Sequence, residues 1–147
     1  MQRRNFLTMI LGAAAIMLTS PMQALAAVWN KRAFEAVKLN EAVNNLAIET
    51  VIPSADIDII APDRAENGAI VQIEITSRIP NTQAISVLVE KNPTALIGHF
   101  VFSNGALAHL VTRIKMADTS DVKVIVKAGN LYFSAAKIVV VLENGCG

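Results

Sequence analysis

The segment AIVQIEITS, residues 69–77, alternates apolar and polar side chains from Val71 to Thr76. Its residues fall on two sides of an extended chain, with Val71, Ile73 and Ile75 on one side and Gln72, Glu74 and Thr76 on the other. Successive side chains of a β-strand point to opposite faces of the sheet, so this period of two predicts a half-buried strand. The segment AISVLVE repeats the pattern with Ile85, Val87 and Val89. Strands of this kind predict an all-β fold.

More strand-like segments surround these two, and turn signals separate them about every 8–12 residues. They are DIDII, ALIGHFVFS, LAHLVTRIKM, DVKVIVKA with Lys123 and Lys127 outward, and LYFSAAKIVVVL. The turn-rich stretch APDRAENG ends in Asn67-Gly68, and Asn104-Gly105 is a second strong turn pair. About seven short strands with this spacing predict a small antiparallel β-sandwich.

One stretch has a different period. Between Lys31 and Leu46, apolar residues recur at near-helical spacing with charged residues between them. The apolar set is Phe34, Val37, Val43 and Leu46. This pattern predicts one short amphipathic helix before the strands, with Pro53 closing the region.

The first 26 residues have the organisation of an export signal. A basic opening, MQRRNFLT, precedes the apolar run MILGAAAIML, and Ala24 and Ala26 form an A-x-A cleavage site. We therefore expect residues 1–26 to be removed and the mature chain to begin at Ala27. A retained membrane anchor is the alternative, but the apolar run is shorter than the roughly 20 residues that span a bilayer. We expect no stable membrane insertion.

The segment RRNFL, Arg3 to Leu7, resembles the twin-arginine export signature, and the glycine and alanine content of the following run agrees with it. The resemblance implies export of an already folded protein to the bacterial periplasm, by a route that can carry a partner along. An ordinary secretory signal that carries two arginines by chance is the alternative.

The charge balance and the length of the mature chain limit its possible partners and its domain organisation. Residues 1–26 hold two of the 13 basic residues and no acidic one, so 121 residues remain with 11 basic and 12 acidic side chains. No basic stripe is present, and we expect no nucleic-acid partner. A chain of this length can bury one core, so residues 27–142 are predicted to be a single domain and residues 143–147 a C-terminal arm.

The usual signatures of catalysis are weak. His99 and His109 are the only histidines, each within a strand-like run, and a half-buried or surface role is favoured over a metal site. Asp56 and Asp58 lie on the same face of a strand, which is typical of a solvated edge. The sequence has no glycine-rich phosphate loop and no G-x-S-x-G elbow. We expect no catalytic residue, no metal site and no cofactor.

The single cysteine, Cys146, is the last residue but one. A lone cysteine in an exported protein is either free or paired with another molecule. Its neighbours Gly145 and Gly147 leave the sulfur unshielded and give the backbone wide conformational freedom. Five extended residues from Glu143 reach ~17 Å, at about 3.3–3.6 Å per residue. The tail can therefore be a tether that delivers a thiol to another protein, or Cys146 can be an accident of a tail without function.

Several segments of residues 27–147 resemble the SoxY family, the sulfur-carrier subunits of the periplasmic thiosulfate-oxidising system. The similar segments are APDRAENGAIV (61–71), VLVEKNP (87–93), TRIKM with TSDVKVIVKA (112–128), and the closing Gly-Cys-Gly. They occur in the family's usual order.

The resemblance implies an immunoglobulin-like sandwich that pairs with a small SoxZ-like β-protein. It implies a flexible, swinging C-terminal arm on which Cys146 carries sulfur intermediates, with Asn144, Gly145 and Gly147 supplying flexibility. Separate Sox enzymes, a haem-containing c-type cytochrome and a manganese-dependent hydrolase, would dock transiently to load and strip the cargo. The chain would then be a carrier and not an enzyme. A Cys146-linked homodimer is expected as an oxidised by-product.

The tail departs from the family pattern in one respect. Family members usually end in Gly-Gly-Cys-Gly-Gly, whereas this chain has one glycine on each side of Cys146 and Asn144 before them. The sulfur donor can be thiosulfate or a different species. Two other functions stay open: a structural or binding sandwich with an incidental tail cysteine, and a one-cysteine redox enzyme that would need an activating base beside the thiol.

Overall fold

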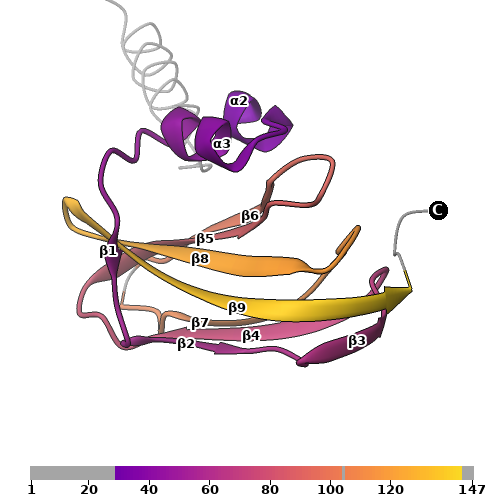
Figure 1. Ribbon diagram of the computed structural model, residues 1–147. Helices are drawn as coiled ribbons and strands as arrows, with labels where there is room; N and C mark the ends of the chain where they lie inside the picture. The colour runs from indigo at the N-terminus through magenta and orange to yellow at the C-terminus, as the bar shows by residue number, and fades with distance from the viewer. Residues whose placement is uncertain (1–28, 104, 144–147) are drawn as a thin grey trace, which may run out of the picture.

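The computed structural model describes residues 29–103 and 105–143, and nine strands and two short helices make up this part of the chain (Figure 1). The helices are α2 (Lys31–Glu35) and α3 (Leu39–Asn45). The strands are β1 (Ile52–Pro53), β2 (Ile57–Ile60), β3 (Arg64–Asn67), β4 (Val71–Ser77), β5 (Thr82–Val89), β6 (Leu96–Val101), β7 (His109–Ile114), β8 (Ser120–Ala128) and β9 (Leu131–Glu143).

The strands form two sheets that pack face to face. The larger sheet has the order β1-β9-β8-β5-β6, and β3 pairs with the far end of β9. The smaller sheet has the order β2-β4-β7 and lies below the larger one in Figure 1. Neighbouring strands are antiparallel except that β1 and β3 both run parallel to β9. The predicted immunoglobulin-like β-sandwich is confirmed, with two short parallel pairings added to it.

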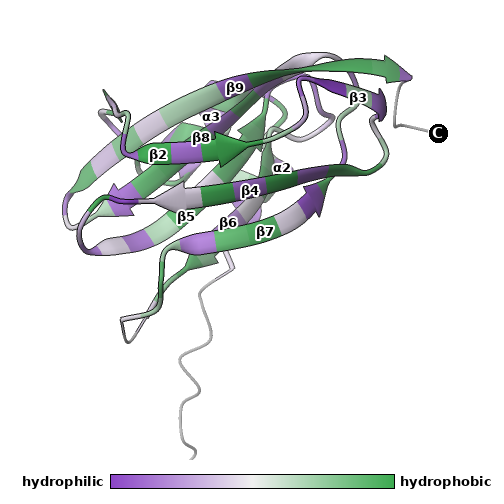
Figure 2. Ribbon diagram, turned by 90° about the horizontal axis from the view of Figure 1, so that it is seen from below, coloured by the Kyte–Doolittle hydropathy of each residue, from purple (hydrophilic) through white to green (hydrophobic). Residues whose placement is uncertain are grey.

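The main core lies between the two sheets. Ile73 and Ile75 of β4 face Ile85 and Val87 of β5, and the exposed fraction of all four is zero. Figure 2 shows the corresponding alternation of apolar and polar residues along β4. Fully burying an aliphatic side chain contributes roughly 1.5–3 kcal/mol. The alternation predicted for these strands is therefore confirmed as the pattern that holds the two sheets together.

A second core lies on the opposite face of the larger sheet, beneath the helices. Leu88 and Ile125 of the sheet pack with Ala33 of α2 and Ala42 of α3, and each is at most 1% exposed. As a consequence, β5 is buried on both faces from Ala84 to Val89. The sandwich thus carries a helical third layer on one side (Figure 1).

The single predicted helix between Lys31 and Leu46 is wrong, because the structure has two helices with a break between them. Ala36 is extended (φ −67°, ψ 122°), and Val37 is 62% exposed. The carbonyl of Ala36 accepts a hydrogen bond of 3.0 Å from the amide of Ala95, in the β5–β6 connection. This contact fixes the extended backbone against the sheet at the break. Pro53 belongs to β1.

The stretch APDRAENG contains a strand as well as the predicted turn. Residues 64–67 form β3, in which Ala65 is 7% exposed. The turn at Asn67-Gly68 is confirmed, because the side-chain oxygen of Asn67 accepts a 2.7 Å hydrogen bond from the amide of Ala69. This Asx-type bond ends β3 and leads the chain into β4.

Candidate functional site

The residues predicted to form the sulfur-carrying arm, Asn144, Gly145, Cys146 and Gly147, lie outside the described residues, as do residues 1–26. The structure therefore describes the segment that leads into the tail. This segment, residues 138–143 at the end of β9, is called the root of the tail. This part continues beyond the end of β8, whose pairing with β9 begins at Ser120 opposite Val139.

One side of the root is held by β3. Ala65 lies opposite Val141, and Asn67 lies opposite Glu143. The amide of Val140 donates to the carbonyl of Asp63 at 3.0 Å. These parallel pairings continue the larger sheet up to Glu143.

The other side of the root is held by a side chain. The amide of Val141 donates to Oγ1 of Thr119 at 2.9 Å, so the amides of Val140 and Val141 bond to opposite edges of β9. The turn residue Gly68 completes the clamp, because its carbonyl accepts a 2.8 Å bond from the amide of Met116 in the chain leading to Thr119. The residues before the tail are consequently fixed to the sandwich from both edges.

The root also alternates in burial. Val139 and Val141 face the core, at 0% and 8% exposed, while Ile138 and Leu142 are 59% and 56% exposed. An apolar side chain thus faces solvent immediately before Glu143 and the tail.

The two histidines do not meet. Nδ1 of His99, in β6, lies 2.9 Å from the hydroxyl of Ser86, and Nδ1 of His109, in β7 of the other sheet, lies 3.0 Å from that of Thr76. Within residues 29–103 and 105–143, no three histidine, cysteine or acidic side chains are close enough to hold a metal ion. The interpretation of both as structural strand histidines is consistent with these neighbours.

His99 nevertheless has a perturbed environment. Its pKa is lowered from the ordinary value of 6.5, first because the ring is partly desolvated and second because the positive charge of Lys127 opposes protonation. Although much of the residue is exposed, Nδ1 is turned inward to Ser86, which is only 3% exposed.

The paired aspartates bind an arginine. Arg78 forms ion pairs with Asp58 and, at 3.8 Å, with Asp56, and it donates to the carbonyl of Ala55 at 2.7 Å. The side chains are exposed, so such pairs contribute at most about 1 kcal/mol each. The expected solvated edge is thus confirmed, with Arg78 as a neutralising partner.

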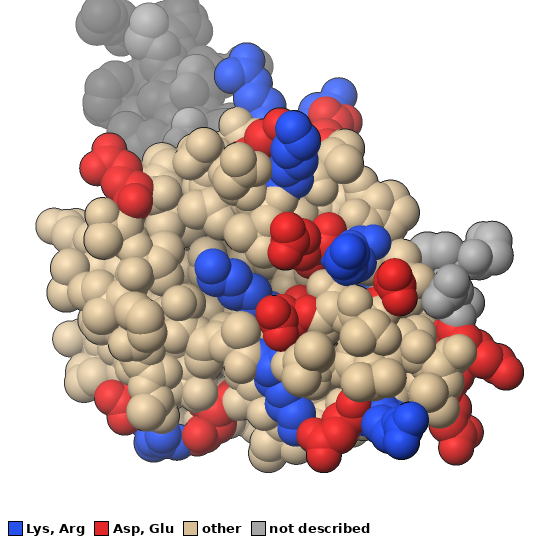
Figure 3. All heavy atoms as spheres, viewed as in Figure 1, with Lys and Arg blue, Asp and Glu red and all other residues tan. Residues whose placement is uncertain are grey.

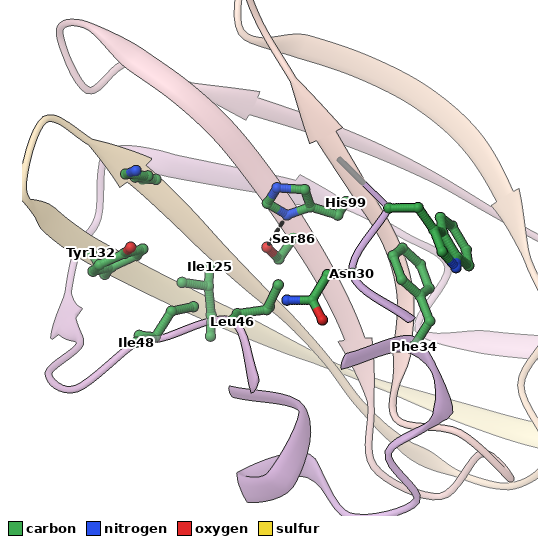
Figure 4. A pocket seen from close by; sticks show the side chains of 10 residues that line it. Asn30, Phe34, Leu46, Ile48, Ser86, His99, Ile125 and Tyr132 are labelled. Atoms are coloured by element: carbon green, nitrogen blue, oxygen red, sulfur yellow. Dashed lines mark hydrogen bonds between the residues drawn. The ribbon is translucent and has the colours of Figure 1, made fainter. Parts of the chain in front are cut away.

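A cavity of about 270 Å³ opens between the helices and the outer face of the larger sheet (Figure 4). Its lining includes His99, Ser86, Lys127 and Tyr132. The sequence predicts His99 as a strand histidine and Lys127 as an outward lysine, but their presence in one cavity depends on strand order and register, which no local motif encodes. The cavity was therefore missed by sequence reasoning.

The face of the molecule seen in Figure 3 carries acidic and basic side chains interspersed, with no basic stripe. No helix in the part of the chain that the structure describes is long and apolar enough to cross a membrane.

Comparison with known proteins places the chain in a family. The family described as sulfur oxidation protein SoxY matches residues 43–146, which is well over half of the chain. This chain belongs to the SoxY family. The match spans every strand described above and extends through Cys146, so the family resemblance inferred from sequence segments is confirmed.

A solved structure supports the same assignment. The sulfur carrier protein SoxY from Chlorobium limicola f thiosulfatophilum is 30% identical with a TM-score of 0.65, over 71% of this chain and 96% of the other. A CARDB domain of a Pyrococcus furiosus protein is 15% identical, over 63% of this chain and 98% of the other, but its TM-score of 0.36 is too low to support any argument. The search of curated proteins gave no match.

Proposed function

We propose that this SoxY-family chain is a sulfur-carrier protein that holds sulfur-oxidation intermediates covalently on Cys146. The observation that carries the proposal is the family match, which runs to residue 146 and so includes the only cysteine of the chain. The similarity to a solved sulfur carrier protein supports it. The two-sided clamp on β9 supports it as well, because a tether needs a firm attachment point.

The chemistry requires a thiolate at the end of the tail. When the thiolate of Cys146 joins the terminal sulfur of a donor such as thiosulfate, an S–S bond forms and two electrons leave the pair. A redox partner must accept those electrons, and a c-type cytochrome can do so. A hydrolase can then cleave the oxidised sulfur from the carrier with water. Asn144, Gly145 and Gly147 supply the arm that moves Cys146 between such partners, and the chain itself needs no cofactor.

The stable partner is a small SoxZ-like β-protein. Among the described residues, β6 pairs only with β5 and β7 only with β4, so each sheet has an edge strand with free hydrogen-bonding groups. Natural sheets cover or pair such edges, and a β-rich partner can do so. Dimerisation through Cys146 of two copies is an oxidised side product.

The carrier protein functions in the periplasm. Residues 1–26 have the pattern of a cleaved export signal, and Arg3 and Arg4 favour the twin-arginine route. Since that route carries folded proteins, a partner without its own signal can be exported together with this chain.

The test is the intact mass of the protein purified from its native periplasm without reductant. Because Cys146 is the only cysteine, every thiol-linked adduct must lie on it. We expect a series of sulfur-containing adducts that map to the C-terminal peptide and that reductant removes. The matched control is Cys146→Ser, which should fold normally and carry none. A parent protein whose thiol is always bare, under conditions of active sulfur oxidation, would instead favour a binding sandwich with an incidental cysteine.

A further inference from the structure

The cavity beneath the helices has one apolar wall and one polar wall. The apolar wall comes from the N-terminal segment, with Phe34, Leu46 and Ile48, and Trp29 stacks on Phe34 at a ring-centroid distance of 4.2 Å. The floor is Ile125 of β8, which is 1% exposed. In Figure 4 the His99–Ser86 pair lies between Tyr132 on one side and Phe34 on the other.

Strand register brings the polar groups together. His99 lies opposite Ser86 across β6 and β5, and Lys127 lies opposite Tyr132 across β8 and β9. Ile125 lies opposite Ser86 across β8 and β5, so the two polar pairs occupy neighbouring rows of the same face. Strands β5, β6 and β9 thus contribute a hydroxyl or an imidazole to the cavity that Lys127 of β8 also lines.

The polar wall is positively charged. Lys127 is absent from the ion pairs found among the described residues, and the cavity is lined by no acidic side chain from that part of the chain. His99 and Lys127 both line the cavity, and the Lys127 charge contributes to the lowered pKa of His99. Because Nδ1 of His99 is engaged by Ser86, Nε2 is the ring nitrogen left for another hydrogen bond.

We propose that this cavity binds a small organic anion, with its carboxylate or sulfonate on Lys127 and its apolar body against Phe34 and Trp29. An anion supplies the acceptor that this group of donors lacks, and the stacked aromatic rings suit a flat or short hydrocarbon body. The size agrees, since a cavity of roughly 150 Å³ accommodates benzene and this one is larger. Among the described residues, none from 138 to 143 at the end of β9 lines this cavity.

The chain contains its own probe for this test. Trp29 is the only tryptophan, so intrinsic fluorescence reports directly on the cavity. The purified protein is titrated with benzoate, with the neutral benzamide and the cationic benzylamine as ligands of matched shape, and with inorganic sulfate. We expect saturable quenching by benzoate and binding at least about tenfold weaker for the other three, the range of one charge-assisted hydrogen bond. Calorimetry checks each titration.

Three variants locate the anion. Lys127→Met should weaken benzoate binding at least about tenfold, and Lys127→Arg, which keeps the charge, should retain most of it. Lys123→Met is the matched control, because Lys123 is an outward lysine of the same strand that does not line the cavity. Thermal unfolding verifies that each variant is folded. Equal binding of benzamide, equal binding of sulfate, no saturable quenching, or an equal loss in Lys123→Met would each overturn the proposal.

Discussion

The amide of Gly68 donates a 2.9 Å hydrogen bond to the carbonyl of Glu143, the residue that directly precedes the tail. Gly68 follows β3, so a turn some 75 positions earlier in the chain holds the residue after which the proposed arm begins. A carrier arm works only if its base is fixed and its tip is free to reach partners.

The attachment of the root to the sandwich can be weakened by removing one hydroxyl group. Thr119→Val removes the hydroxyl that accepts the Val141 amide and leaves that partly buried donor without its partner. We expect a loss of about 1–3 kcal/mol in the free energy of unfolding, measured by urea denaturation. Amide hydrogen exchange should also become faster at Val141. Thr50→Val, at an exposed loop position, is the control and should change stability by less than ~0.5 kcal/mol. Equal losses in both variants would argue against the clamp.

The backbone beside Cys146 can be made more rigid without a change in the root of the tail. Gly145→Pro fixes φ near −65° beside the thiol and restricts the paths that Cys146 can follow. We expect partner-dependent sulfur turnover to fall, while a small thiol reagent labels Cys146 at the parent rate. Gly145→Ala, which adds a methyl group at the same position without fixing φ, is the comparison variant and should keep most of the turnover. Unchanged turnover in Gly145→Pro would show that the reach of the arm does not limit the reaction.

Export tests the assignment of residues 1–26. Arg3→Lys together with Arg4→Lys keeps the charge of the opening but removes the arginine pair that the twin-arginine route recognises. We expect precursor to accumulate in the cytoplasm, detected by immunoblotting of cell fractions. The exported parent should begin at Ala27 on N-terminal sequencing. Normal export of the double variant would indicate an ordinary secretory signal.

The alternation of residues 71–77 and 85–89 predicted the sandwich because burial of one sheet face follows from a period of two. The same logic could not predict the helical layer. Ser86 and Leu88 occupy the positions that should face solvent, yet both are buried, because α2 and α3 cover that face. Whether a strand is covered on one side or on both depends on packing between distant segments.

The candidate site, too, was predictable from the sequence only in part. Cys146 was evident from sequence because it is a lone thiol between glycines at the chain end. The clamp on β9 was not, since β3 lies within a stretch whose composition is typical of a turn, and its short parallel pairing arises only when the chain returns beside β9. The cavity likewise required the register that places Lys127 beside Tyr132.

The packing beneath the helices should contribute measurably to the stability of the fold. Leu88→Ala deletes a fully buried side chain beneath the helices, and we expect it to lower the free energy of unfolding by about 2–5 kcal/mol. Leu131→Ala is the matched control, because Leu131 is 54% exposed and should cost far less. Urea denaturation measures both. A small effect at Leu88 would mean that the helices are only loosely attached to the sheet.

The free energy of unfolding should depend on pH through His99. Because desolvation and then Lys127 lower the pKa of His99 in the folded protein, the unfolded chain binds the His99 proton more tightly than the folded one. Between the lowered pKa and the ordinary value of 6.5, the unfolded state therefore carries more protons, and the free energy of unfolding must fall as the pH decreases through this window. His99→Gln should remove that part of the pH dependence, which denaturation curves on both sides of the window measure. Lys127→Met should remove only the second cause, so the His99 titration followed by NMR should move upward toward 6.5 without reaching it. A parent protein and a His99→Gln variant with the same pH dependence, or a His99 titration unmoved in Lys127→Met, would show that His99 does not sense the cavity and its lysine.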